Sequence, residues 1–134
     1  MRSPAHDTAL YLADLPDFGS FGGSTGWPLY VGREPIDPVD VVTVYDTGGG
    51  PAVLIPDLRA PNVQVRVRSA AYNDGWQKAN EAYEALAVPA GVTVQDGVIL
   101  SWVAQGDINY IGRDDRDRSL FTCNWQVMRD GVAS

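Results

Sequence analysis

The stretch Asn62-Val63-Gln64-Val65-Arg66-Val67-Arg68-Ser69 alternates apolar and polar side chains along most of its length. Successive side chains of a β-strand point to opposite faces, so the three valines share one face and Gln64, Arg66 and Arg68 share the other. The stretch therefore predicts a strand that places its valine face on the protein core. Exposed charges usually contribute little, so Arg66 and Arg68 belong either to a solvated face or to a contact with a partner.

The C-terminal part of the chain repeats this pattern. A strand is predicted from Ser119 to Arg129, and it pairs with a strand at about 108–112 across the charged turn 113–118. One face of the longer strand carries Phe121, Cys123, Trp125 and Val127. Cys123 is therefore expected among core residues, where a thiol behaves as a small hydrophobe, and we assign it no role.

Shorter strands are predicted at residues 27–31 and 39–45, and a hairpin at 92–95 and 98–104 around the turn Asp96-Gly97. A first helix begins at the cap Ser3, with proline next in the chain, and ends before Pro16. A second helix runs from Asp74 to Pro89. Its core stripe is predicted to consist of Trp76, Ala79, Tyr83 and Leu86.

These elements predict one α+β domain that spans residues 1–134, with a mainly antiparallel sheet and two packed helices. A chain of 134 residues suits a single domain, since domains usually hold roughly 100 to 200 residues. Eight of the nine prolines lie at or before Pro61, together with most of the clustered glycines. We therefore expect long Gly/Pro-rich loops at residues 17–26 and 46–60.

Composition excludes several classes of function. The net charge of −7 and the pI of about 4.4 argue against binding to a nucleic acid backbone. No apolar run approaches the roughly 20 residues of a membrane span, and the N-terminus lacks the apolar segment of a signal peptide, so we expect a cytoplasmic protein. A single cysteine forms no internal disulfide and no thiolate cluster.

Catalysis and cofactor binding find little support in the residues. The only histidine is His6, near the N-terminus, which leaves a small hydrolase as a remote alternative. Gly48, Gly49 and Gly50 lack the lysine and hydroxyl of a phosphate-binding loop, and the aspartates of 114–117 miss the calcium-loop pattern. We therefore expect no cofactor and no metal. A sugar-stacking platform made from some of the tryptophans is a second remote alternative.

The order of the motifs is more informative than any single one. Trp27-Pro28-Leu29-Tyr30 is followed by Tyr45-Asp46-Thr47-Gly48-Gly49-Gly50-Pro51, and then by the strand 61–68 with its helix from Asp74. The chain ends on Ile111-Gly112-Arg113-Asp114-Asp115-Arg116-Asp117-Arg118 and the strand to Arg129. Over nearly its whole length the chain resembles the tail terminator family of long, non-contractile-tailed bacteriophages, often labelled minor capsid proteins.

The resemblance implies a non-enzymatic subunit of a ring, sixfold in the family, that stops tail tube polymerisation and offers a docking surface to the head. The implied partners are copies of the chain itself, the tail tube protein and a head-completion or connector protein. The implied location is the virion tail or neck, after assembly in the host cytoplasm. Another neck component, such as a stopper or head-tail connector protein, is the nearest alternative.

Candidate interface residues follow from this reading. Arg66 and Arg68 offer positive charge to the acidic first half of another copy, since residues 1–60 carry a net charge of −5. The other candidates for a subunit or tube interface are Gly48, Gly49, Gly50, Arg113, Asp114 and Arg116. We expect the loops 17–26, 46–60 and 112–118 to order only on assembly, and the joint charge reversal of Arg66 and Arg68 to weaken assembly without loss of fold.

Overall fold

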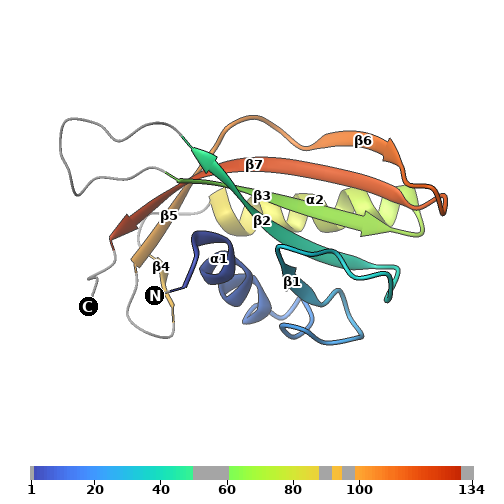
Figure 1. Cartoon of the computed structure of the whole chain (residues 1–134), viewed down its shortest axis with the longest axis horizontal. Helices are drawn as coiled ribbons and strands as arrows, with labels where there is room; N and C mark the ends of the chain where they lie inside the picture. Colours follow the sequence, from blue (N-terminus) through green and yellow to red (C-terminus); the bar gives the residue numbers. More distant parts are fainter. Residues whose placement is uncertain (1, 50–60, 88–91, 95–98, 131–134) are drawn as a thin grey trace.

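The computed structural model of the chain describes residues 2–49, 61–87, 92–94 and 99–130 (Figure 1). These residues form two helices and a seven-stranded sheet, which confirms the α+β class. The helices are α1 (Pro4–Ala13) and α2 (Tyr72–Ala87). The strands are β1 (Leu29–Val31), β2 (Val41–Gly49), β3 (Pro61–Ser69), β4 (Val92–Thr93), β5 (Ile99–Ala104), β6 (Asn109–Arg113) and β7 (Ser119–Asp130).

The sheet is mainly antiparallel and runs in the order β1-β2-β3-β7-β5-β4. Only the pair β1 and β2 is parallel among the described strands. The long strand β7 pairs with β3 along one edge, and with β6 and then β5 along the other. Therefore β1 and β6 lie toward opposite edges of the sheet.

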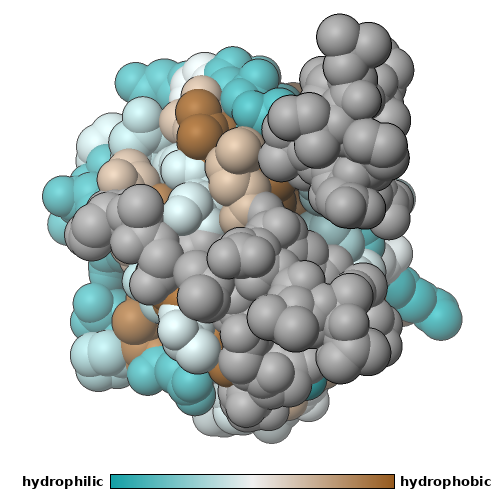
Figure 2. Space-filling view, turned by 90° about the vertical axis from the view of Figure 1, so that its left-hand side faces the viewer, coloured by the Kyte–Doolittle hydropathy of each residue, from teal (hydrophilic) through white to brown (hydrophobic). Residues whose placement is uncertain are grey.

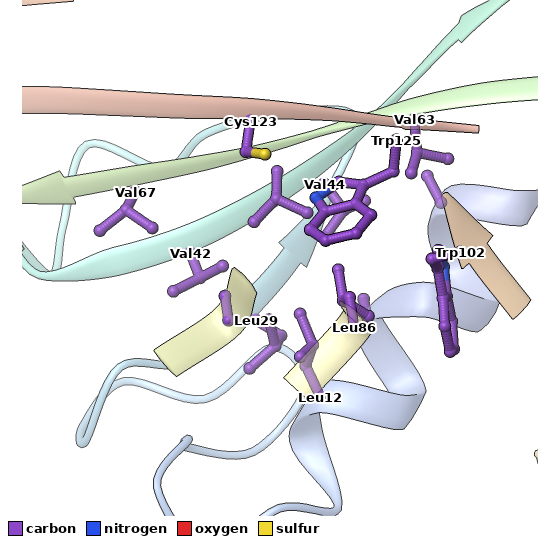
Figure 3. Packing of buried hydrophobic residues seen from close by; sticks show 14 of the residues in the cluster. Leu12, Leu29, Val42, Val44, Val63, Val67, Leu86, Trp102, Cys123 and Trp125 are labelled. Carbon is purple, nitrogen blue, oxygen red and sulfur yellow. The ribbon is translucent and has the colours of Figure 1, made fainter. Parts of the chain in front are cut away.

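Both helices cover the same face of this sheet (Figure 1). Helix α1 packs beneath β1, β2 and β3, while α2 packs beneath β3, β7 and β5. The predicted alternation of β3 and β7 is confirmed, because Val63, Val65 and Val67 pair with Trp125, Cys123 and Phe121 on the core face. Figure 3 shows Val63, Val67, Cys123 and Trp125 on the side of the sheet that faces Leu12 of α1 and Leu86 of α2.

Helix α1 begins as the sequence predicts. The Ser3 hydroxyl accepts a hydrogen bond from the His6 backbone N–H at 3.2 Å, which caps the first turn. A second acceptor comes from the sheet, where an Asp46 carboxylate oxygen accepts from the Ala5 N–H at 2.9 Å. A negative charge at this end also suits the helix dipole. Asp46 thus joins the N-terminal end of α1 to β2.

Helix α2 corrects the predicted core stripe. It begins at Tyr72 rather than Asp74, and its buried residues are Gly75, Lys78, Ala79, Ala82 and Leu86. Trp76, predicted to be buried, is 45% exposed. The physical reason is close packing: a Cβ at Gly75 would lie 2.6 Å from the Phe121 ring, so the helix approaches the sheet through small residues. Trp76 follows Gly75 in the chain, so its side chain points away from the buried side of the helix and is exposed.

Several predicted strands differ from the structure in their bounds. Strand β2 begins at Val41 and continues to Gly49, whereas the sequence predicted 39–45. The antiparallel pairing of β4 with β5 is confirmed, and the predicted Asp96-Gly97 turn between them lies outside the described residues. None of the described helices is both long and apolar enough to cross a membrane.

Candidate functional site

The face of the sheet away from the helices is partly covered by residues 32–40, which we call the strap. Arg68 lies on this face, as predicted, but it is only 1% exposed. Its Nε donates to the Val39 carbonyl at 3.0 Å, and its Nη2 donates to the carbonyls of Pro38 at 2.7 Å and Ile36 at 3.2 Å. The guanidinium therefore holds the strap on the sheet of its own molecule.

Glu34 of the strap pairs with both arginines of β3. Its two carboxylate oxygens lie 3.3 Å from Arg66 Nε and 3.3 Å from Arg68 Nη1. Burial lowers the pKa of the Arg68 guanidinium, and the negative charge of Glu34 opposes that shift. Arginine stays charged even so, because its ordinary pKa is far above neutrality. The strap thus supplies the counter-charge that β3 needs.

This arrangement corrects one expectation about the two arginines. Arg68 has no free surface, and reversing its charge would place a carboxylate beside Glu34 and three carbonyl oxygens. The joint reversal of Arg66 and Arg68 would therefore disturb the fold as well as any contact. Arg66, with 28% of its side chain exposed, is the member of the pair that a partner can reach.

The charged turn between β6 and β7 is a compact hairpin tip. Arg118 pairs with Asp114 at 2.7 Å, and Arg113 pairs with Asp117 at 2.8 Å. Burial disfavours the charge on Asp114, but hydrogen bonds from Arg118 and Arg116 lower the pKa of its carboxyl overall. Arg118 also donates to the Ile36 carbonyl at 2.8 Å, so the tip is tied to the strap.

The glycine candidates lie at the end of β2. Gly48 follows an irregularity in the pairing with β3 and has a φ of +94°, a conformation that side chains other than glycine rarely adopt. Gly49 is the last residue of the strand, and Gly50 lies outside the described residues. The interface roles predicted for the three glycines, for Arg66 and for the tip residues stay predictions.

Loop 17–26 is built against the body of the molecule, which corrects the expectation that it orders only on assembly. The Gly19 N–H donates to the Trp27 carbonyl at 2.9 Å, and the Tyr30 hydroxyl donates to the Gly23 carbonyl at 2.7 Å. Lys78 donates to the Asp17 carbonyl from beneath the loop. The tip 112–118 is likewise ordered by its own ion pairs, and most of loop 46–60 lies outside the described residues.

Exposed aromatic residues collect where α2 passes β6. The Tyr72 ring lies 4.9 Å from Tyr110 and 5.2 Å from Phe121, measured between centroids. Trp76 follows Tyr72 by one helical turn, and Tyr72, Trp76 and Tyr110 all remain exposed. We call these three residues the aromatic side. Phe121 is buried beneath them, so they form an outward extension of the core.

Sequence reasoning missed the aromatic side and the role of Glu34. The sequence pattern predicts that the second helix begins at Asp74, after Tyr72, and that Trp76 is buried. The sequence did hold a signal that Trp76 is exposed. The small residues Gly75, Ala79 and Ala82 favour close contact between the helix and the sheet on the side that they share. Nothing in the sequence pairs Glu34 with residues more than thirty positions away.

The single histidine of the chain, His6, makes structural contacts. The His6 ring stacks on Phe21 at 4.9 Å, and the hydrogen bond to Ser3 uses its backbone rather than its imidazole. The described His, Cys, Asp and Glu residues form no group of three that could hold a metal ion. Trp102 and Trp125 are buried, so they supply no sugar-stacking surface.

The Cys123 thiol should be nearly inert in the folded protein. Burial raises its pKa from 9.0 to about 11, and the charge of Asp107 adds to the shift. At about pH 8 the native thiol should react with a disulfide reagent about 100-fold more slowly than the thiol of the urea-unfolded chain, because only the thiolate attacks. Equal rates in the two states would contradict this.

The end of the molecule seen in Figure 2 shows no broad apolar face among the residues coloured there. Hydrophobic residues form small separate groups between hydrophilic ones. The exposed large hydrophobic residues include Ile36 on the strap, Val103 and Met128 on β5 and β7, and the aromatic side. Of these, Tyr72 and Tyr110 of the aromatic side make a ring contact with each other.

The described residues thus form a small α+β domain that carries a strapped sheet face, a self-paired charged tip and an exposed aromatic side. The sequence model of the bacteriophage tail terminator protein family matches residues 9–130. The chain belongs to this family, and it is accordingly a structural component of a phage tail that contacts other virion proteins. No curated protein sequence matches the chain.

Proposed function

We propose that copies of this chain close into a ring, six in number, that caps the tail tube and ends its polymerisation. The ring then presents a docking surface to a head-completion or connector protein. The observation that carries the proposal is the match of the tail terminator family over residues 9–130. Assembly takes place in the host cytoplasm, and the role requires neither a cofactor nor a chemical step.

The geometry supports a ring in a specific way. A cyclic assembly with more than two subunits needs heterologous contacts, in which one surface of each copy meets a different surface of the next. The sheet offers two different edges, with β1 toward one and β6 toward the other. The strap and the charged tip, which are joined by the hydrogen bond from Arg118 to the Ile36 carbonyl, form another surface away from these two edges. We assign this surface to contacts along the tail axis, with the tube or the head protein.

Native mass spectrometry and light scattering over a range of protein concentrations test the ring directly. We expect the monomer of 14.5 kDa to give way to one closed species of six copies as concentration rises. Tails assembled without the chain should exceed the normal length, and added chain should restore it. A strict dimer, or open-ended aggregation, would contradict the proposal.

A stopper or connector protein of the neck is the alternative that the sequence left open. Its discriminating result is the order of binding. A terminator binds tube ends in the absence of heads, whereas a stopper binds the head first. Sedimentation of the chain with purified tubes therefore separates the two roles.

A further inference from the structure

We propose that the aromatic side is the surface that receives the next copy of this chain, and that Phe21 and Arg33 at the opposite edge of the sheet are what it receives. This inference rests on the proposed ring and assigns its subunit contact to named residues. The juxtaposition that carries it is a pair of unlike surfaces on opposite edges of one sheet. Each has an exposed aromatic group and a charged side chain that forms no ion pair within the described residues.

The aromatic side has the composition of an interface core. Trp and Tyr are enriched where binding energy concentrates, because they bury a large area with little loss of conformational freedom. Tyr72 and Tyr110 are held in place by their contacts with each other and with buried Phe121. A partner would therefore meet aromatic rings that are already fixed in position, which lowers the entropic cost of binding.

An unpaired sheet edge lies beside these rings. Within the described residues β6 pairs with β7 on one side, and its other side has no partner strand. Asn109, Tyr110 and Ile111 are all exposed along it. Exposed edges are prone to unwanted pairing, and proteins usually protect them. A neighbouring copy in a ring would cover this edge permanently.

The opposite edge of the sheet offers a matching projection. Phe21 bridges Leu29 of β1 from the outer side and remains 40% exposed, stacked on His6. Loop 17–26 is held by the bonds of Gly22 to Leu29 and of Tyr30 to Gly23. Phe21 is thus a rigid aromatic projection at the edge that lies farthest from β6.

Individual exposed charges at the two edges favour this pairing of surfaces. Asp74 lies on α2 between Tyr72 and Trp76, and Asp107 precedes β6; neither takes part in an ion pair among the described residues, whereas Arg113 beside Tyr110 is paired with Asp117. Arg33, next to the end of β1, is exposed, and no described hydrogen bond or ion pair uses its guanidinium. The β1 edge of one copy therefore complements the α2–β6 edge of the next.

Two single variants and their mixture test the assignment. Trp76→Glu and Phe21→Glu should each raise the concentration needed for half-assembly by about 30-fold or more, as expected for an interface hot spot. An equimolar mixture of the two variants should form a dimer and nothing larger, because it retains one intact pair of surfaces. Val103→Glu, at a similarly exposed hydrophobic position on the other face of the sheet, is the matched control and should assemble like the wild type.

A charge exchange gives an independent readout. Asp74→Arg and Arg33→Asp should each weaken assembly, and the two changes in one chain should restore it, since every contact then holds an exchanged pair. Circular dichroism verifies the fold of each variant, and Trp76→Ala replaces Trp76→Glu if the glutamate variant is unfolded.

The outcomes separate this inference from the proposed function. A wild-type chain that never forms a ring overturns both. Rings that form normally from Trp76→Glu and Phe21→Glu overturn the inference alone, and would assign the aromatic side to a tube or head protein if those rings fail to control tail length. Loss of assembly in both variants without a dimer in their mixture also overturns it, because the two surfaces then do not meet.

Discussion

Replacing Arg68 by methionine should lower the free energy of unfolding by about 3–5 kcal/mol, even though the residue occupies a strand face that the sequence marks as polar. Methionine keeps much of the side-chain volume but removes every donor. The carbonyls of Ile36, Pro38 and Val39 lose their partner, and Glu34 keeps only Arg66. Since domains of this kind are stable by roughly 5–15 kcal/mol in total, urea unfolding should show a large shift of the midpoint.

Two variants separate the buried arginine from its neighbour. Arg66→Met removes one partly exposed ion pair and should cost about 1 kcal/mol or less. Arg68→Lys keeps the charge but lacks the planar fork that donates in several directions, so its stability should fall between those of the wild type and of Arg68→Met. Similar midpoints for Arg66→Met and Arg68→Met would refute the role assigned to the buried guanidinium.

Amide hydrogen exchange in the strap tests the role of Arg68 locally. Its backbone is held by Arg68, by Arg118 at the Ile36 carbonyl, and by Asp40, which accepts from the Ala70 N–H at 3.0 Å. In Arg68→Met the amides of the strap should exchange with solvent faster than those of α1. Faster exchange through the whole molecule would mean that the strap and the sheet unfold together.

Arg68 also marks the limit of what the sequence could predict. The alternation of β3 places it correctly on the face away from the valines, because the period of a strand is local information. What covers that face depends on the path of residues 32–40, which lie about thirty positions earlier. No local pattern relates three backbone carbonyls to a distant guanidinium, so the predicted solvated charge proved to be buried.

The second helix shows a different limit. Its existence was predictable from its spacing, but the spacing alone did not decide which of two adjacent stripes of side chains is buried. The small residues Gly75, Ala79 and Ala82 were the one available signal. Large aromatic residues favoured Trp76, whereas the close approach of the helix required Gly75. The sheet surface decided between them, and that surface is set by Phe121 of β7. Tertiary packing thus overrode the stronger hydrophobic signal.

One part of the candidate site was predictable from local sequence, and another part was not. The charged tip was predictable as a self-paired turn, because Arg and Asp alternate within six residues, and the structure pairs Arg118 with Asp114. Loop 17–26 differs, because its glycine content predicts a segment that orders only on assembly, whereas the structure holds it by hydrogen bonds. The bonds that hold it come from Trp27, Tyr30 and Lys78, the last of them far along the chain.

Trp125→Ala should be the most damaging of the simple core substitutions, with a loss of about 3–5 kcal/mol. Trp125 is 1% exposed, lies beside Val63 on β3, and contacts the Tyr83 ring of α2 with centroids 5.1 Å apart (Figure 3). Its removal leaves a cavity between the sheet and the helix layer that neighbouring side chains fill only in part. Thermal unfolding of the monomer measures the loss.

Trp76→Ala is the matched control, because it deletes the same side-chain atoms at an exposed position of α2 instead of a buried position of β7. With Trp76 half-exposed, its removal should change the stability of the monomer by only about 0.5 kcal/mol. It should nevertheless impair assembly, whereas Trp125→Ala impairs assembly only as far as it unfolds the chain. A stability loss at Trp76 as large as that at Trp125 would mean that the exposed indole belongs to the core, and the aromatic side would then owe its exposure to imperfect packing rather than to a partner.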